Sequence, residues 1–251
     1  MTAPRWNDRR VDVLAVVVPA RDEQDRLPGC LRALSATARA VQALPVAPRV
    51  RVLVVQDRCT DGTGRVVSSW PEVETILTSV GRVGGARAAG IAHVLDTEAA
   101  AGVPAERVWI ACTDADTVVP SSWLHTHLTH ARAGDDLLLA MVRLDGDELP
   151  AAALRAWADR HPTRDGHPHV HGANLGVRGD VYEAVGGFAD VPEHEDVLLS
   201  RAVRDRGGRV AAVVAGPVLT SARLDGRLDG GMAGYLREMV AVVEPRWRPS
   251  A

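Results

Sequence analysis

The sequence predicts an α/β fold in which a mostly parallel sheet is flanked by helices. Short apolar runs, such as 11–18 and 50–55, lack polar alternation, which is typical of strands buried on both faces. Between them lies the longer stretch 25–41, where apolar residues recur every three or four positions as in an amphipathic helix. Because strands and helices alternate along the chain, we expect parallel pairing.

In the first half, each predicted strand is followed by a predicted helix or turn. Thr60, Asp61 and Gly62 follow the second strand and are residue types that cap a helix N-terminus. Apart from Arg87, the segment 84–90 contains only glycine and alanine, which predicts close packing at the start of a helix. The predicted elements are strands at 11–18, 50–55, 73–77 and 108–112, and helices at 25–41, from residue 60, and at 81–95.

The second half continues the alternation and is richer in histidine, glycine and proline. No linker-like tract separates the halves, so we expect a single domain over residues 1–251. The predicted elements are helices at 121–131, 150–160, 197–205 and 232–243, and strands at 137–142, 169–177 and 209–214.

The composition excludes several function classes. The 251 residues include 29 basic and 32 acidic side chains, which gives a net charge of −3, and every basic residue is an arginine. Without lysine there is no Schiff base, no pyridoxal phosphate anchor and no Walker A lysine. The arginines are scattered, and aromatic residues make up only 4% of the chain, so we expect no nucleic acid partner.

Cysteine spacing and hydropathy favour a cytoplasmic protein. Cys30, Cys59 and Cys112 stand far apart without a CxxC pair, which fits a reduced compartment. No stretch approaches the roughly 20 apolar residues of a membrane-spanning helix, so we expect no integral membrane segment. The predicted helix at 232–243 is amphipathic; core packing is one expectation, and contact with the inner membrane face or with a second copy in a homodimer is the other.

Polar residues follow three of the predicted strands at the point where each strand ends. These are Pro19–Glu23, Gln56–Asp61 and Asp114–Asp116. Ligands of open parallel sheets bind at the carboxyl ends of the strands. An Asp-x-Asp turn there can supply oxygen ligands to Mg²⁺ or Mn²⁺, while a solvated turn or a helix cap is the alternative.

Five motifs occur along the chain in order. They are Pro19–Glu23, Gln56–Thr63, Gly81–Gly90, the Asp-x-Asp sequence Asp114-Ala115-Asp116, and Gly186-Gly187-Phe188 followed by Glu195-Asp196. Together they resemble the family 2 glycosyltransferases of small soluble bacterial type, which have the GT-A fold. The resemblance spans most of the chain. It implies a Rossmann-like nucleotide-sugar-binding half at about 10–117, an acceptor and catalytic half at about 118–230, and a C-terminal helix and tail at 231–251.

The resemblance also implies roles for individual residues. Asp116 and Asp114 would hold Mn²⁺ or Mg²⁺, and Asp196, with Glu195 beside it, would be the catalytic base. Capping of the following helix is the alternative for these two acids. The residues implied to bind the donor are Pro19, Ala20, Arg21, Glu23, Asp57, Gly84, Arg87, Asp114, Ala115, Asn174, Arg223 and Arg227.

Two departures from the family pattern leave the donor open. Gln56 stands where the family has the first aspartate of its second motif, so the donor is expected to be a UDP-sugar or a GDP-sugar. The family's histidine near the last strand is missing from residues 220–227, and Arg223 or Arg227 is expected to neutralise the diphosphate instead.

Two groups of histidines fall outside these motifs. His167, His169 and His171 alternate, which on a strand would place them on one face, as a polar loop and wall of the acceptor pocket or as a metal or anion site. His125, His127 and His130 indicate an exposed helix face.

The expected function is metal-dependent, inverting transfer of a sugar from a nucleoside-diphosphate sugar to the hydroxyl group of an unidentified acceptor. Three alternatives stay open: a retaining transferase resembling glucosyl-phosphoglycerate synthases, a sugar-phosphate nucleotidyltransferase, and a catalytically inactive nucleotide-sugar-binding protein.

Overall fold

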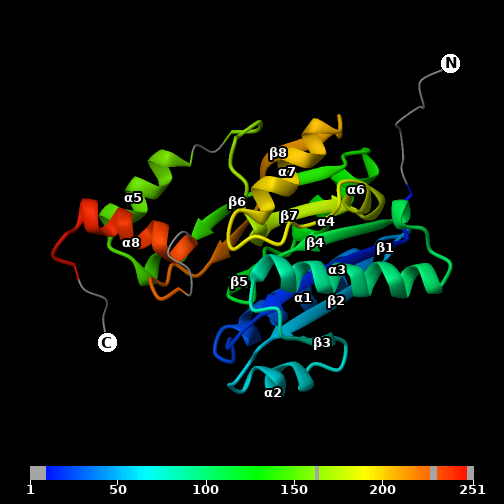
Figure 1. The fold of residues 1–251 in the computed structure, drawn as a ribbon, viewed down its shortest axis with the longest axis horizontal. Helices are drawn as coiled ribbons and strands as arrows, with labels where there is room; N and C mark the ends of the chain where they lie inside the picture. The colour runs from blue at the N-terminus through cyan, green and yellow to red at the C-terminus, as the bar shows by residue number, and fades with distance from the viewer. Residues whose placement is uncertain (1–9, 162–163, 227–230, 248–251) are drawn as a thin grey trace.

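The described residues form a twisted eight-stranded sheet with helices on both faces (Figure 1). The computed structural model describes residues 10–161, 164–226 and 231–247. The strand order is β3-β2-β1-β4-β7-β6-β8-β5. The strands are β1 (Val13–Ala20), β2 (Arg49–Asp57), β3 (Glu74–Thr78), β4 (Val108–Cys112), β5 (Thr117–Val118), β6 (Leu137–Leu144), β7 (Leu175–Arg178) and β8 (Val210–Thr220).

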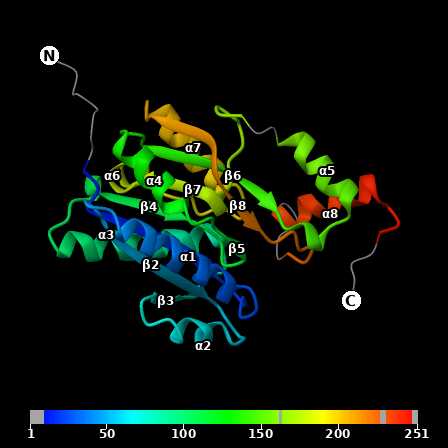
Figure 2. The same ribbon diagram turned by 180° about the vertical axis from the view of Figure 1, so that it is seen from behind.

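Most of the helices lie in two layers, one on each face of the sheet. Helices α1 and α4 cover one face, and α3, α6 and α7 cover the other (Figure 2). The helices are α1 (Leu27–Gln42), α2 (Thr63–Ser68), α3 (Val83–Ala100), α4 (Trp123–Arg132), α5 (Ala151–Arg160), α6 (Gly179–Ala184), α7 (Glu195–Asp205) and α8 (Met232–Val243). Short 3₁₀ turns lie at Ala105–Arg107, Gly146–Glu148 and Gly172–Asn174.

Parallel pairing dominates the half of the sheet around β1. Strand β1 pairs in parallel with β2 and β4, and β2 pairs in parallel with β3. Strand β7 is antiparallel to both β4 and β6, β5 is antiparallel to β8, and β6 and β8 are parallel. The predicted α/β class with a mostly parallel sheet is confirmed. The carboxyl ends of β1, β2 and β4 therefore meet at one edge.

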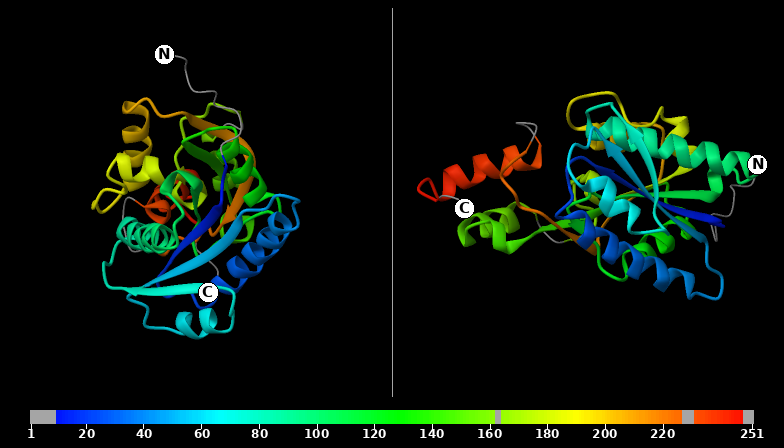
Figure 3. Two further views of the ribbon diagram at one scale, coloured as in Figure 1. Left: turned by 90° about the vertical axis from the view of Figure 1, so that its right-hand side faces the viewer. Right: turned by 90° about the horizontal axis from the view of Figure 1, so that it is seen from below.

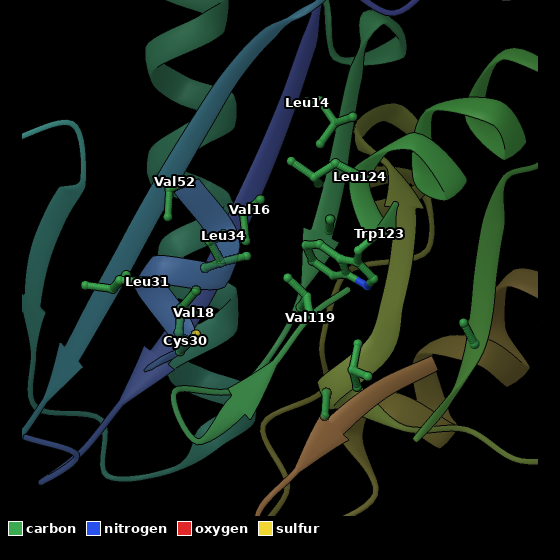
Figure 4. Packing of buried hydrophobic residues seen from close by; sticks show 14 of the residues in the cluster. Leu14, Val16, Val18, Cys30, Leu31, Leu34, Val52, Val119, Trp123 and Leu124 are labelled. Carbon is green, nitrogen blue, oxygen red and sulfur yellow. The ribbon is translucent and has the colours of Figure 1, made fainter. Parts of the chain in front are cut away.

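The buried centre of the fold is β1, all eight residues of which are buried. Leu14, Val16 and Val18 point toward α1 and α4, where they meet Leu31, Leu34 and Trp123 in one apolar cluster (Figure 4). The alternate residues of the strand, from Val13 to Val17, pack against α3 and α7 in a second cluster. An uninterrupted apolar run is what a strand covered on both faces requires.

Helices α5 and α8 pack on each other at one end of the sheet, apart from the two main layers (Figure 3). Trp157 of α5 meets Leu236 and Met239 of α8 in a separate apolar cluster. Core packing therefore accounts for the apolar face of α8, although Val242 on its outer side is exposed. Among the helices described, none has the length and apolar character needed to cross a bilayer.

The predicted strand at 169–177 is wrong over most of its length, because only Leu175–Arg178 pairs in the sheet. The preceding residues form the 3₁₀ turn Gly172–Asn174. The backbone N–H of Gly172 donates to the carboxylate of Asp196 at 2.7 Å. A Cβ on Gly172 would lie 2.5 Å from the Arg87 guanidinium. The hydrogen bond to Asp196 ties the turn to α7, and the closeness of Arg87 leaves no room for a side chain at position 172.

The rings of His167, His169 and His171 nevertheless lie next to one another. Successive ring centroids are 5.9 and 6.1 Å apart, and the ring of His161 joins the group 4.5 Å from His169. His161 itself stacks on Trp157 of α5 at 3.6 Å. Through His161 these ring contacts connect the loop with Trp157 of α5. The three alternating histidines are therefore neighbours although they do not lie on a strand.

The prediction that His127 belongs to an exposed helix face is wrong. His127 is 1% exposed and lies against Trp109 and Trp123. Its Nδ1 accepts a hydrogen bond from Trp109 Nε1 at 3.1 Å, so this nitrogen carries no proton. Burial lowers the pKa of His127 to about 3. Its helix neighbour His125 is exposed as predicted, and His130 pairs with Asp135.

Protonation of His127 is expected to destabilise the fold in acid. The pKa in the folded protein lies below the ordinary 6.5, so the folded state favours the neutral ring. The contribution of His127 to the free energy of unfolding is then fully present above about pH 6.5. It is lost as the pH decreases toward 3, by about 1.4 kcal/mol per pH unit. Urea unfolding between pH 7 and pH 5 should show a shallower pH dependence for His127→Gln than for the wild type.

The matched control is His125→Gln, which changes an exposed histidine on the same helix. It should keep the wild-type pH dependence. Equal pH dependence of all three proteins would contradict the assignment of the effect to His127.

Candidate functional site

A cleft of about 830 Å³ opens at the carboxyl ends of β1, β2 and β4. Residues at the start of α3, in the chain after β8 and at the start of α8 also line the cleft. Most of the residues predicted to bind the donor lie here. The described residues that line the cleft include Pro19, Ala20, Arg21, Glu23, Asp57, Arg82, Asp114, Ala115, Asp116, Thr220, Ser221, Arg223 and Met232.

Arg223 joins two acidic residues of the cleft that come from different strands. Its guanidinium contacts both carboxylate oxygens of Glu23, with Nη1 to Oε2 at 3.0 Å and Nη2 to Oε1 at 2.5 Å. The same Nη2 lies 3.0 Å from Asp116 Oδ2. A contact in which two guanidinium nitrogens meet both oxygens of one carboxylate is stronger than a single hydrogen bond between the same groups. Glu23 follows β1 and Asp116 follows β4, so Arg223 bridges the two motifs that the strand ends bring together.

Arg87, which is absent from the described cleft lining, makes a second bridge between two acidic residues. It is 3% exposed and contacts Asp114 Oδ1 and Glu195 Oε1, each at 2.5 Å. Burying a guanidinium is unfavourable unless carboxylates neutralise it, and two do so here. Glu195 is also absent from the described cleft lining, and it neutralises the charge of Arg87. Neither the predicted catalytic role nor the alternative of helix capping included this contact.

The small residues at the start of α3 make this bridge possible. A Cβ on Gly84 would lie 2.7 Å from Glu195 Cγ. Gly84 is buried and is absent from the described cleft lining. It therefore makes room for the Glu195 side chain instead of facing the cleft. Gly90, farther along α3, likewise leaves room for Val17 and Val55 of the sheet.

Asp57 lines the cleft at the end of β2, but its carboxylate is already hydrogen-bonded. It accepts from the backbone N–H of Gly81 at 2.9 Å and from the Thr78 hydroxyl at 3.1 Å. These bonds fix the loop that leads into α3. Gln56, the departure from the family pattern, donates to Thr75 Oγ1 at 2.9 Å.

Asp196, predicted as the base, lies in the first turn of α7, beside the cleft lining. Its Oδ2 accepts from the Gly172 N–H at 2.7 Å, and its Oδ1 accepts from the Val197 N–H at 2.8 Å. Ala173, next to Gly172, does line the cleft. The bond to Val197 shows that Asp196 satisfies a helix N–H, so a basic role for it stays a prediction.

Besides Gly84 and Arg87, two further residues predicted to bind the donor, Asn174 and Arg227, are not among the described residues that line the cleft. Asn174 is 0% exposed, and its amide is used entirely within the fold. Its Nδ2 donates to the carbonyls of Met141 and Gly216, and its Oδ1 accepts from Trp123 Nε1 at 2.8 Å. The structure places Asn174 outside the described cleft lining, and its expected donor contact stays a prediction. Arg227 lies outside the described residues.

Several cleft residues were missed by the sequence analysis. Thr220 is the last residue of β8 and Ser221 follows it, so the rule that polar residues gather at strand ends would have found them. The predicted strand ended at 214, six residues too early, because Gly216 and Pro217 interrupt the apolar run. Arg82 lies inside the motif Gly81–Gly90 and Met232 begins the predicted helix at 232–243, but neither was predicted as a site residue, and no pattern marked Pro192.

Asp114 and Asp116 carry the oxygen ligands that a hard divalent cation prefers, but they are only two side chains. Burial, together with the charge of Asp114, raises the pKa of Asp116 to about 6, so the site favours a cation near these carboxylates. Over the ranges that the structure covers, no group of three His, Cys, Asp or Glu side chains is arranged to hold a metal ion. Magnesium often takes one or two protein carboxylates, with phosphate oxygens and water as its other ligands, so Asp114 and Asp116 would be enough carboxylates for it.

Comparison with protein families finds one match, and comparison with curated proteins finds none. The family model described as glycosyl transferase family 2 matches residues 15–175. No curated protein matches the chain. The family match covers the strand-end motifs from β1 to the start of β7.

Solved structures with bound nucleotides or sugar nucleotides share the fold. TarS 1–349 from S. aureus in complex with UDP-GlcNAc has a TM-score of 0.62 and 12% identity over 92% of this chain and 67% of that one. The mannosyltransferase PcManGT from Pyrobaculum calidifontis, with GDP-Man and Mn²⁺, has a TM-score of 0.58 and 19% identity, covering 96% and 66%.

Glucosyl-3-phosphoglycerate synthase from Mycobacterium tuberculosis, with Mn²⁺, UDP and phosphoglyceric acid, has a TM-score of 0.53 and 14% identity over 92% and 78%. At these identities the likeness concerns the fold. The chain spans about two thirds of the length of the TarS fragment and of PcManGT, and 43% of a longer TarS chain.

Gly84→Ala should destabilise the protein by about 1–3 kcal/mol, because the new methyl group would press on Glu195 and disturb the bridge through Arg87. Urea unfolding measures the change. Gly29→Ala is the matched control: it is also a helical glycine, and its Cβ would meet nothing closer than Val118 at 3.9 Å. It should be neutral or slightly stabilising. Equal effects of the two substitutions would contradict the close contact.

Proposed function

Since the chain belongs to glycosyl transferase family 2, we propose that it transfers a sugar from a nucleoside-diphosphate sugar to a hydroxyl acceptor in the cleft described above. The observation that carries the proposal is the meeting of Asp114 and Asp116 with the ends of β1 and β2 in one cleft. Neighbours of the same fold with UDP-GlcNAc or GDP-Man bound support this ligand class.

Asp116 and Asp114 are the residues that would hold Mn²⁺ or Mg²⁺. Structures of the same fold that contain Mn²⁺ support such a cation. When bound, the cation would stabilise the negative charge that develops on the leaving diphosphate. Arg223 adds a second positive charge on the same side of the cleft, and its forked guanidinium matches phosphate oxygens.

Asp196 is the proposed base of an inverting transfer. The acceptor oxygen attacks the anomeric carbon, the bond from that carbon to the diphosphate oxygen breaks with its electron pair leaving on the diphosphate, and Asp196 takes the hydroxyl proton. Its two backbone hydrogen bonds fix the orientation of the carboxylate. Glu195 is the weaker candidate, because Arg87 already holds it.

A retaining outcome is the second candidate, and one observation favours it. An inverting base must face the acceptor, yet Asp196 is absent from the residues that line the described cleft. Nuclear magnetic resonance of the product, at the anomeric carbon, distinguishes the two outcomes directly.

Asp116→Asn should abolish the effect of Mn²⁺ on donor binding and reduce transfer at least a hundredfold, because one metal-binding carboxylate is lost. The first assay is a thermal-shift screen of UDP- and GDP-sugars with and without Mn²⁺. Asp225→Asn is the matched control: it removes the same charge from the exposed rim of the same cleft. An Mn²⁺-dependent shift that survives in Asp116→Asn would contradict the assigned metal residue.

Asp196→Asn should leave donor binding within about twofold of the wild type while lowering the transfer rate at least a hundredfold, the usual contribution of a general base. Single-turnover kinetics separates the two steps. Glu195→Gln is the comparison, and it is expected to lower the stability as well, since Arg87 would lose a partner. A wild-type rate in Asp196→Asn, together with a retained anomeric configuration, would establish the second candidate.

A further inference from the structure

The guanidinium of Arg223 already contacts one of the two aspartates that the proposed function assigns to the cation. Its Nη2 lies 3.0 Å from Asp116 Oδ2, and the forked contact with Glu23 holds it there. The positive charge therefore sits against the carboxylate that a metal ion would have to reach. A cation at Asp116 would meet strong repulsion from a guanidinium so close.

The loop that carries Arg223 is tied to the cleft at several points. The Ser221 N–H donates to the Asp116 carbonyl at 3.2 Å, and the Ser221 hydroxyl donates to Glu148 Oε2 at 2.6 Å. Farther along, Arg237 of α8 donates to the Leu224 carbonyl at 2.7 Å. The backbone of this loop thus stays beside the Asp-x-Asp turn while the Arg223 side chain is able to change partner.

The two arginines on the aspartate pair differ in their freedom to move. Arg87, on Asp114, is enclosed, with only 4% of its side chain exposed and a second carboxylate holding it. Arg223, on Asp116, has 29% of its side chain exposed to the cleft. A ligand in the cleft can therefore reach Arg223. A diphosphate offers several charged oxygens to the guanidinium, whereas Asp116 offers one, in addition to the fork with Glu23.

We propose that Arg223 competes with the divalent cation for Asp116 in the ligand-free protein and moves to the donor diphosphate when both bind. The proposal rests on the proposed function. It makes cation and donor mutually dependent, because the diphosphate removes Arg223 from Asp116 and the cation then takes its place. Such coupling is reciprocal: each ligand strengthens the binding of the other by the same factor.

The experiment titrates Mn²⁺ alone into the full chain and follows free Mn²⁺ by electron paramagnetic resonance. Arg223→Gln should bind Mn²⁺ about tenfold more tightly than the wild type, since the competing charge is gone. Addition of UDP or GDP should strengthen Mn²⁺ binding by a larger factor in the wild type than in Arg223→Gln. Asp116→Asn in the Arg223→Gln background should remove the gain, which locates the ion.

Arg82→Gln is the matched control. Arg82 lines the same cleft, but it pairs with Asp190 and not with the aspartates of the Asp-x-Asp turn. Its removal changes the net charge by the same amount and should leave the affinity for Mn²⁺ alone within about twofold of the wild type. Thermal unfolding of each variant verifies that the proteins compared are folded.

Three outcomes would overturn the proposal: equal Mn²⁺ affinity of Arg223→Gln and the wild type, an equal gain in Arg82→Gln, or the same nucleotide effect with and without Arg223. Failure of the proposed function is a different result. It would appear as absence of binding and transfer for every nucleoside-diphosphate sugar, whereas the titration with Mn²⁺ alone needs no sugar.

Discussion

The buried guanidinium of Arg87 is the constraint on which the arrangement of the cleft depends. A charge enclosed in the protein interior must be neutralised, and this one requires both Asp114 of the turn after β4 and Glu195 at the start of α7. The bridge joins the first half of the sheet to a helix of the second half. Glycine at 84 and at 172 follows from the same constraint, because a side chain at either position would strike a member of the bridge.

Arg223 repeats the chemistry of Arg87 in a different environment. Both arginines connect two carboxylates, and each takes one aspartate of the Asp-x-Asp turn. The enclosed pair positions the turn permanently. The more exposed bridge, from Arg223 to Glu23 and Asp116, lies in the cleft. There the positive charge of Arg223 attracts anionic ligands. Since the chain has no lysine, arginine supplies every such contact.

The sheet could be predicted from the sequence because its strands are covered on both faces. Residues 108–112 form a strand with the predicted bounds, and the helix at 232–243 also has the bounds that its apolar periodicity indicates. Errors occurred where a contact from a distant segment decides the local conformation. The 3₁₀ turn at 172–174 contacts Asp196 of α7, and the buried His127 of α4 contacts Trp109 of β4.

The sequence by itself determined the alternation of strands and helices, the strand ends that carry acidic residues, and therefore the edge where the cleft opens. Burial period and the direction of parallel strands are local properties, so the residue pattern contains them. Only the tertiary structure decided the partners of those acidic residues. The pairing of Glu23 with Arg223, 200 positions away, and of Arg87 with Glu195 requires the folded chain to bring charges together. Arginine and carboxylate have no spacing rule over such distances, so proximity alone selects the pairs.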